Sequence, residues 1–343
     1  MNKLRHLGIR FFRGSDHLRL SRRPLFFVHV PKTAGTSFRC GLEQLLPKED
    51  RALFDYGIHA GKTSPAILRM CEANDPWQIF KLVSEHSIDL LAGHVPAKKY
   101  VHMFGVANTV TFLRDPMQRV YSEYQHARRI NGYRKDFAHF FRSPHNQNRQ
   151  SKLLQGVVPE ALGFVGITER YSESLTAVNE MLGIGIPEIQ SNQGRQNLAE
   201  FYEFSGETED ELRWLNRQDI HLYEKFDRIL SLRTDLRARG LSFVHGRLVK
   251  VDPKMVSGWA WFAPLDGISA DEPVELELMR NDRVVQTMVA KQYRGGMSML
   301  SPPRAGYVGF SCHHDGKAGD VLSCRVAGSG QVLSPDSVVV PSS

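Results

Sequence analysis

The chain has 343 residues, of which 41% are hydrophobic and 24% are charged, and its formal net charge at pH 7 is +7. These values are typical of a soluble globular protein that is long enough for two domains. No apolar run reaches the roughly 18 residues that a membrane-spanning helix needs, so the composition predicts no integral membrane segment.

The positive charge is unevenly distributed along the chain. Residues 246–343 contain ten Lys or Arg and ten Asp or Glu, so the whole excess lies in the first 245 residues. A basic N-terminal part suits an anionic ligand, such as a nucleotide, a sulfated or phosphorylated sugar, or nucleic acid. The alternative is that the excess positive charge only keeps the protein soluble.

Residues 1–24 form a basic N-terminal segment, MNKLRHLGIRFFRGSDHLRLSRRP. It lacks the apolar core of about 7–15 residues that a signal peptide requires, and a transit peptide is the alternative that its Arg content suggests. The four cysteines, at positions 40, 71, 312 and 324, have no CxxC spacing, so no zinc or redox motif is predicted. We expect four reduced thiols, with a Cys312–Cys324 bridge as the alternative.

Residues 25–245 have the pattern of an α/β domain. Short apolar runs that predict buried parallel strands lie at residues 25–30, 88–92 and 109–113. Amphipathic segments that predict helices lie at residues 37–46, 116–130, 169–183 and 207–236. Strands that alternate with helices predict a parallel sheet flanked by helices and joined by right-handed crossovers.

Residues 246–343 have a different pattern. Short runs broken by Gly, Pro, Asn and Asp replace the long amphipathic segments. Within residues 274–278, apolar and acidic side chains alternate with the period of a half-buried strand, and Asn281-Asp282 suits a hairpin turn. We therefore predict a small all-β sandwich here, without a catalytic constellation.

The stretch LFFVHVPKTAGTS, residues 25–37, has the design of a phosphate-binding loop: a buried strand that ends abruptly before a helix. Gly35 allows a tight turn and a close approach of the backbone, and Thr36 or Ser37 can cap the helix, whose free N–H groups attract anions. Lys32 adds a mobile positive charge. An ordinary strand–turn–helix connection is the alternative. The GxxxxGK[ST] order of a Walker A loop is absent.

A second strand-to-helix junction lies in TVTFLRDPMQRVYSEYQ, residues 109–125. Arg114 ends the strand, and Asp115 and Pro116 suit the N-cap and the first helical position. Ser122 lies about two turns into the helix, and Arg119 shares a face with it. Arg is suited to bidentate phosphate contacts, which a Ser hydroxyl can complete, whereas Arg119 can equally be a solvated surface charge.

A third junction, SIDLLAGHVP at residues 87–96, places His94 directly after a buried strand. A lone His is more often structural than catalytic. Ligands of open α/β sheets bind at the carboxyl edge of the strands, however, so Lys32, His94 and Arg114 are predicted to converge on one crevice.

On these motifs, the sequence resembles the sulfotransferases that use 3′-phosphoadenosine 5′-phosphosulfate (PAPS). PKTAGTS at 31–37 resembles their 5′-phosphosulfate loop, and RDPMQRVYSEY at 114–124 resembles their 3′-phosphate motif. The spelling of the first motif, with GHV at 93–95, is most similar to the carbohydrate branch of heparan and dermatan uronyl 2-O-sulfotransferases and its bacterial relatives. Further similarity lies at 148–156 and 165–175, so the resemblance covers roughly residues 25–235.

The resemblance implies a role for each matching residue. Lys32 and His94 are the implied catalytic residues, with Lys32 stabilising the leaving phosphate and His94 accepting the proton of the acceptor hydroxyl. The implied cofactor-binding residues are Lys32, Thr33, Ala34, Gly35, Thr36, Ser37, Arg114 and Ser122. Further residues of a cofactor or acceptor loop are Arg119, Gln150, Lys152 and Arg195, although Lys152 stands where the family leads us to expect Arg.

The implied reaction is an in-line transfer of a sulfuryl group from PAPS to an acceptor hydroxyl, with 3′,5′-bisphosphoadenosine (PAP) as product. The resemblance to a branch that acts on glycans implies a carbohydrate as the acceptor. No metal is required, because Lys and Arg supply the positive charge. The partners expected are the anionic nucleotide donor and a glycan or other hydroxyl-bearing acceptor, with no nucleic acid, and a cytoplasmic, bacterial location is expected. The domains expected are a basic segment at 1–24, a P-loop-like sulfotransferase domain at 25–245 and an accessory β-sandwich at 246–343, which loosely resembles β domains of bacterial glycan-modifying enzymes.

Two other functions fit parts of the sequence. A P-loop nucleotide kinase or phosphotransferase would share the strand–loop–helix design, but it needs a Walker A loop and a magnesium-binding Asp, which the motifs do not contain. A non-enzymatic glycan-binding protein would act through the β domain. The combination of Lys32, His94, Arg114 and Ser122 favours an enzyme over such a protein.

Overall fold

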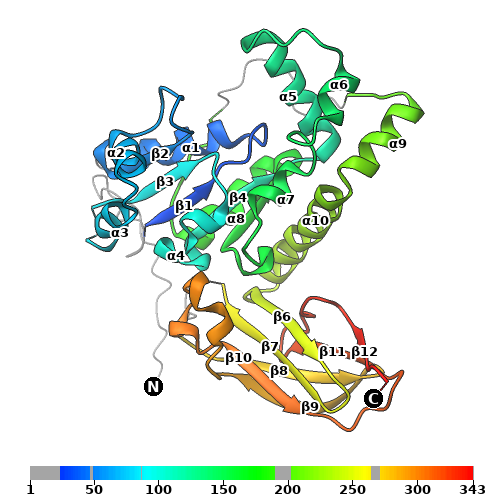
Figure 1. Ribbon diagram of the computed structural model, residues 1–343. Helices are drawn as coiled ribbons and strands as arrows, with labels where there is room; N and C mark the ends of the chain where they lie inside the picture. Colours follow the sequence, from blue (N-terminus) through cyan, green and yellow to red (C-terminus); the bar gives the residue numbers. More distant parts are fainter. Residues whose placement is uncertain (1–23, 47–48, 86, 190–201, 264–270, 343) are drawn as a thin grey trace, which may run out of the picture.

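The computed structural model of the protein describes residues 24–46, 49–85, 87–189, 202–263 and 271–342. Residues 1–23 of the predicted basic segment and Arg195 lie outside the described residues. A five-stranded, all-parallel sheet with the strand order β2-β3-β1-β4-β5 forms the N-terminal part (Figure 1). Its strands are β1 (Leu25–Val28), β2 (Ala52–Asp55), β3 (Leu90–Gly93), β4 (Thr109–Leu113) and β5 (Phe164–Ile167).

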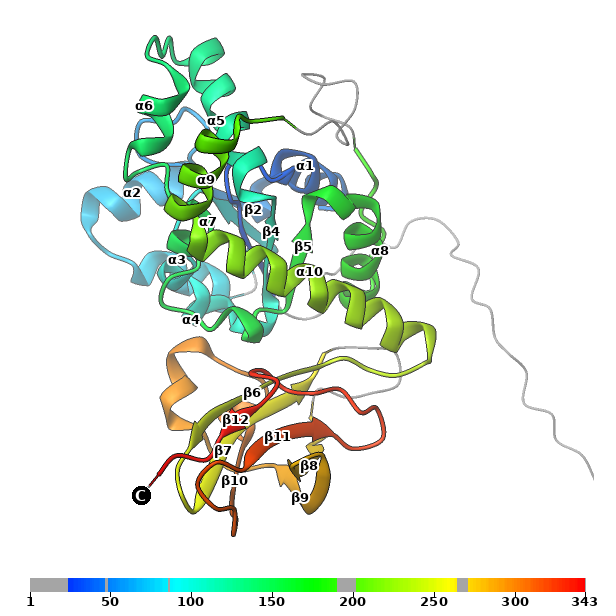
Figure 2. The ribbon, with the colours of Figure 1, turned by 90° about the vertical axis from the view of Figure 1, so that its right-hand side faces the viewer.

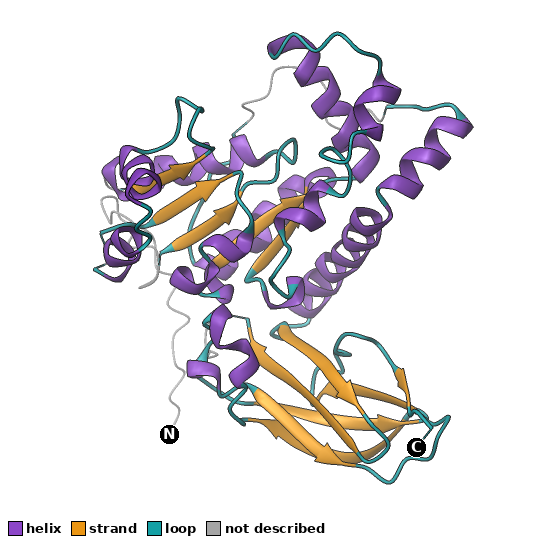
Figure 3. Cartoon of the chain, viewed as in Figure 1, coloured by secondary structure: helices purple, strands orange, loops and turns teal. Residues whose placement is uncertain are grey.

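Helices cover both faces of this sheet (Figure 3), as the sequence predicts for parallel strands buried on both sides. The helices are α1 (Gly35–Leu45), α2 (Pro65–Ala73), α3 (Trp77–Ser84), α4 (Val101–Phe104), α5 (Pro116–Ile130), α6 (Phe137–Arg142), α7 (Arg149–Leu153), α8 (Tyr171–Leu182), α9 (Gly206–Leu215) and α10 (Arg217–Ala238). None of the helices in the described ranges has the length and apolar character needed to cross a membrane.

The C-terminal part consists of two antiparallel sheets that face one another, so the predicted α/β fold with a small C-terminal β-sandwich is confirmed. One sheet has the order β10-β7-β6 and the other β12-β11-β8-β9. The strands are β6 (Val244–Val251), β7 (Met255–Phe262), β8 (Val274–Arg280), β9 (Arg283–Ala290), β10 (Gly309–His313), β11 (Val321–Val326) and β12 (Val338–Val339). Asn281 and Asp282 both have positive φ and form the predicted hairpin turn.

Several predicted boundaries are wrong in detail. The first strand ends at Val28 rather than residue 30, and the third lies at Leu90–Gly93 rather than 88–92. The helix predicted at 207–236 is two helices, because the buried Asn216 ends α9 and precedes α10, where its side chain bonds Leu212 O and Asn148 N. Cys312 and Cys324 are both free thiols, so the alternative of a disulfide is wrong.

One hydrophobic core joins the parallel sheet to part of the β-sandwich. Trp259 and Trp261 of β7 and Leu300 of the 3₁₀ helix η6 (Gly295–Leu300) pack in the same buried cluster as the parallel strands. Figure 2 shows the sandwich lying against the end of the α/β part, next to α4 and α10. This shared core predicts that the two parts unfold together rather than separately.

A buried ion cluster lies in the same interface. Glu160, in the 3₁₀ helix η4 (Pro159–Ala161), pairs with Lys225 of α10 and with Arg247 of β6, whose Nη1 lies 3.1 Å from the carboxylate. Burial by itself would raise the pKa of Glu160, but the charge and hydrogen bond of Lys225, with a smaller contribution from Arg247, give a net lowering.

We expect Glu160→Gln to lower the free energy of unfolding at pH 7 by about 1–3 kcal/mol, because it leaves two partly buried cations without their anion. A lowered carboxyl pKa stabilises the fold above the unfolded pKa of about 4.5, and this gain is lost as the pH falls through the folded pKa. The difference in free energy of unfolding between the variant and the wild type, measured by urea titration, should therefore become smaller below about pH 4. An equal difference at pH 7 and pH 3 would contradict the electrostatic origin.

Candidate functional site at the carboxyl edge of the parallel sheet

The strand order of the parallel sheet reverses direction between β1 and β4. After β1 the chain moves to the β3 side of the sheet, and after β3 it crosses to β4 on the other side. Such a switch point opens a crevice at the carboxyl ends of the two strands, where α/β proteins bind ligands. The loops that leave β1 and β4, at residues 29–34 and 114–115, meet at this point.

The loop after β1 turns through left-handed residues. Lys32 and Ala34 have φ values of 69° and 59°, and Ala34 is the N-cap of α1 without a side-chain capping bond. Where residues in the left-handed conformation alternate with residues in other conformations, successive main-chain N–H groups point into one concavity. Such a concavity is a known anion-binding geometry. The N–H groups of Gly35 and Thr36, in the first turn of α1, have no carbonyl within the helix to bond and also point to that end.

These dihedrals correct two expectations. The helix begins at Gly35, so neither Thr36 nor Ser37 is its cap, and Thr36 is half-buried in the first turn. Gly35 is also not the turning residue, since it does not have positive φ. Its lack of a side chain is required for another reason: a Cβ there would lie 2.2 Å from Cδ2 of His29.

His29 fills the space beneath the loop. Its ring is 6% exposed, stacks on Phe27 and bonds the Tyr56 hydroxyl through Nδ1 at 2.9 Å. Desolvation, followed by the nearby His94, lowers the pKa of His29 well below its ordinary value, so the ring is neutral at pH 7. Thr33 is also fully buried, and its hydroxyl donates to Val30 O at 2.9 Å. Thr33 therefore closes the loop through its side chain, and only its main chain can face a ligand.

Arg114 lies across the crevice from this loop and contacts it. Its Nη1 donates to the Lys32 carbonyl at 3.2 Å, and its Nε lies 3.8 Å from Glu169. Gln150 holds its main chain on both sides, accepting from Arg114 N at 2.9 Å and donating to Arg114 O at 2.8 Å. The predicted Lys32 and Arg114 loops are thus in direct contact, with Arg114 fixed in position.

Helix α5 begins as predicted, with Asp115 accepting from Gln118 N at 2.9 Å and Pro116 as its first residue. Ser122 is half-buried, and its hydroxyl makes no hydrogen bond to another described residue. One turn further along the helix, Nδ1 of His126 is buried without a partner in the same part of the chain. This face of α5 therefore keeps polar groups available for a ligand.

His94 follows β3, and its main-chain N–H donates to Asp55 O at 3.0 Å. Gly93 permits this approach, because a Cβ there would lie 2.1 Å from Asp55 O. The imidazole packs edge-to-face against His29 and Tyr56, with ring centroids 4.6 and 4.7 Å apart, while part of the ring stays exposed. Desolvation, with a smaller contribution from Arg149, lowers the pKa of His94 to about 4. At neutral pH the ring is therefore neutral and accessible.

The electrostatics link these groups into one site. Desolvation and then the charges of Arg114 and Arg129 lower the pKa of Lys32, and Glu123 acts against them. Glu123 also raises the pKa of His94, so the carboxylate lies within electrostatic reach of both residues. His29 is in turn affected by both His94 and Lys32. The site has more cations than anions, which favours an anionic ligand.

The secondary candidates have structural roles. Arg119 is completely buried, pairs with Glu123 and donates to Asn146 O at 3.0 Å, so the alternative of a solvated surface charge is wrong. Gln150 is completely buried and holds Arg114 in place. Lys152 is exposed and donates to Pro144 O.

The structure adds residues that the sequence analysis did not nominate. Arg149 is half-buried, has a buried Nε without a partner among the described residues, and influences the pKa of His94. Arg149 lies within the segment 148–156, which carries part of the family resemblance. That match is the sequence signal by which it could have been nominated. Glu123 stands four residues after Arg119, a spacing that signals an ion pair, but its reach toward Lys32 and His94 depends on tertiary structure.

No cluster of three or more His, Cys, Asp or Glu suited to a metal ion occurs among the residues that the structure describes.

No protein-family model matches the chain, and no curated protein matches it. Among solved structures, the chain is similar to a sulfotransferase from Alicyclobacillus acidocaldarius, with 15% sequence identity and a TM-score of 0.33. The match covers 59% of this chain and 95% of that chain.

The close approach of Gly35 to His29 generates a prediction. Gly35→Ala should lower the free energy of unfolding by about 1–3 kcal/mol, the usual cost of overpacking. In a double-mutant cycle, combining it with His29→Ala should restore part of this loss, because the small side chain removes the clash. Gly185→Ala is the matched control, since a Cβ there meets nothing within 4 Å. Strictly additive effects of the two substitutions would contradict the proposed clash.

Proposed function

We propose that the chain is a sulfotransferase that moves a sulfuryl group from PAPS to a hydroxyl of an acceptor, with a carbohydrate as the acceptor class. The observation that carries the proposal is the hydrogen bond from Arg114 to the main chain of Lys32 at the switch point. It brings together two cationic strand-to-helix junctions, which matches a donor that carries phosphate groups at two ends. The motif resemblance supplies the identity of that donor.

The residues present fit such a nucleotide. The 5′ end would be held by the left-handed loop at Lys32 and Ala34 and by the first-turn N–H groups of α1. The 3′-phosphate would be held by Arg114 and by the Ser122 hydroxyl, which has no partner among the described residues. PAPS would supply an activated sulfuryl group on a phosphate leaving group. The Lys32 ammonium would stabilise the negative charge that develops on that leaving group, since a partly desolvated cation interacts strongly with such a charge.

His94 would take the proton of the acceptor hydroxyl. Its ring is neutral at pH 7, exposed on one side and fixed on the other by His29 and Tyr56. A neutral imidazole can accept a proton, and the negative charge of a bound donor would raise its pKa from about 4 toward the neutral range that suits a general base. Lys and Arg side chains supply the positive charge in this arrangement, so it needs no metal.

The remaining expectations belong to the same proposal. Residues 25–245 would form the catalytic domain and residues 246–343 an accessory β domain. The acceptor would be a glycan rather than a nucleic acid, and the enzyme would act in a bacterial cytoplasm. A nucleotide kinase is the competing function, and the choice of nucleotide ligand separates the two.

Nucleotide binding tests the donor site directly. PAP should raise the melting temperature of the wild-type protein in a concentration-dependent manner, and ATP with magnesium should have a much smaller effect. Arg114→Gln should weaken PAP binding by about 10–100-fold, because it removes a charge-assisted contact. Arg128→Gln, an exposed position on the same helix, is the matched control. Stabilisation by ATP with magnesium but not by PAP would favour the kinase.

Turnover tests the role of His94. His94→Ala should lower kcat by about 10²–10⁴-fold, the range for loss of a general base, while the affinity for PAP stays nearly unchanged. The acid limb of kcat/KM in the wild type should lie well below pH 6.5, because this limb reports the free protein, in which the pKa of His94 is about 4. A variant with a rate near that of the wild type, in a radiolabelled-sulfate transfer assay on a glycan panel, would exclude His94 from the reaction.

A further inference from the structure

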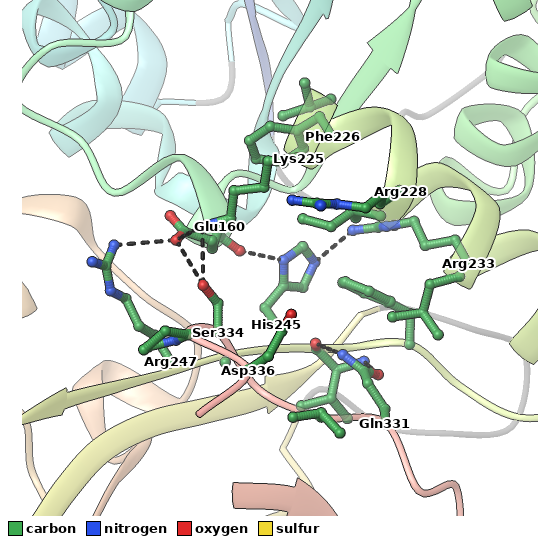
Figure 4. Close-up of a pocket in the computed structure, with 18 of the residues that line it drawn as sticks. Glu160, Lys225, Phe226, Arg228, Arg233, His245, Arg247, Gln331, Ser334 and Asp336 are labelled. Carbon is green, nitrogen blue, oxygen red and sulfur yellow. Dashed lines mark hydrogen bonds and ion pairs between the residues drawn. The ribbon is translucent and has the colours of Figure 1, made fainter. Parts of the chain in front are cut away.

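A second hollow lies at the opposite edge of the parallel sheet from the site described above. It has a volume of about 430 Å³ and lies where η4, α10, β6 and the segment 331–336 meet (Figure 4). Because η4 directly precedes β5, the hollow lies at the amino end of that strand. It is therefore separate from the crevice at the carboxyl ends of β1 and β4.

One side of α10 dominates the wall of this hollow. A stripe of basic and apolar side chains recurs there at helical spacing. It consists of His221, Lys225, Arg228, Ile229 and Leu232. In all, four Lys or Arg line the hollow, against the two carboxylates of Glu160 and Asp336. The lining is thus both cationic and partly apolar.

Glu160 already has several partners. Its carboxylate pairs with Lys225 and with Arg247, and Ser334 donates to it at 3.4 Å, as the dashed lines in Figure 4 show. Asp336 lies exposed in the segment 331–336. Glu160 therefore pairs with Lys225 and Arg247, and no ion pair among the described residues involves the other two arginines of the lining.

His245 connects Glu160 to one of these arginines. Its Nδ1 lies 3.0 Å from Glu160 O and must donate to this carbonyl, so Nε2 is an acceptor for Arg233 at 3.1 Å. The ring is 2% exposed, and desolvation followed by the charge of Arg233 lowers the pKa of His245 to about 3. His245 is therefore a neutral support that fixes the Arg233 guanidinium.

Arg233 is a cation for which the described part of the chain supplies no counterion. One of its nitrogens, Nη2, is used by His245 and by Gly163 O at 3.1 Å, and its guanidinium lies 4.0 Å from the Phe243 ring centroid. Neither Arg233 nor Arg228 has an ion-pair partner among the described residues. Desolvation lowers the pKa of Arg233, which reflects the cost of keeping its charge there unpaired. Its Nη1 and Nε donors remain for a ligand.

We propose that this hollow binds a small organic oxyanion, with Arg233 and Arg228 receiving the anionic group and an apolar body lying against Phe226, Ile229, Leu232 and Phe243. The bound anion would neutralise the fixed guanidinium, and the apolar walls would bury the rest of the ligand. The ligand would contact both the α/β part and the β-sandwich, since Phe243 directly precedes β6, His245 lies in β6 and Arg233 lies on α10. This site does not depend on the proposed sulfotransferase activity.

Calorimetric titration of the full chain with three probes tests the proposal. Phenyl phosphate, phenyl sulfate and benzoate share an apolar ring and differ in the oxyanion, so their order of affinity identifies the preferred group. At least one should bind saturably, and Arg233→Gln should weaken it at least tenfold. Arg217→Gln, at the far end of the same helix, and Arg114→Gln, at the carboxyl edge, should leave this binding unchanged.

Arg228→Gln keeps the test decisive if Arg233→Gln does not fold, because Arg228 is exposed and its replacement should also weaken the probe at least threefold. Bound probe should slow amide hydrogen exchange in residues 243–247 in the wild type. The proposal is wrong if none of the three probes binds saturably, if Arg233→Gln and Arg228→Gln bind as the wild type does, or if Arg114→Gln abolishes binding.

Discussion

The contact between Arg114 and the main chain of Lys32 is the constraint on which the candidate site depends. Parallel strands bring the ends of β1 and β4 to one edge, but neighbouring loops can still diverge. Here the guanidinium spans the gap and bonds the carbonyl of a left-handed residue. That residue holds its strained conformation only because the surroundings fix it, with Thr33 closing the loop and His29 filling the space below.

A layer of buried polar groups holds Arg114 in turn. Gln150 bonds both sides of its peptide, and Asp219 of α10 accepts from Gln150 N at 3.0 Å and from Ser151 N at 2.7 Å. Glu169 accepts from Asp115 N at 3.1 Å and from the Tyr223 hydroxyl of α10 at 3.2 Å. Each of these polar groups is buried or half-buried and satisfied, which favours a single arrangement of the junction after β4.

The sequence predicts the elements whose signals are local and strong. The strand Thr109–Leu113 and the helix Pro116–Ile130 have the predicted bounds, because a continuous apolar run is followed by a capping Asp and a Pro. Strands β2 and β5 escape prediction, because Asp55 ends the apolar run of β2 after three residues and Gly166 interrupts that of β5. Within the site, motif residues can be nominated from sequence, but the burial of Arg119 and the support of Arg114 by Gln150 depend on which loops fold over them.

Helix α10 connects the two ends of the molecule. Its first turns supply Asp219 and Tyr223, which hold the groups around Arg114, and its later turns supply Lys225 and Arg233, which face the β-sandwich. The β-sandwich also buries Trp259 and Trp261 in the core of the α/β part. The C-terminal part thus contributes to the stability of the parallel sheet, and it packs against the same helix whose first turns hold the groups around Arg114.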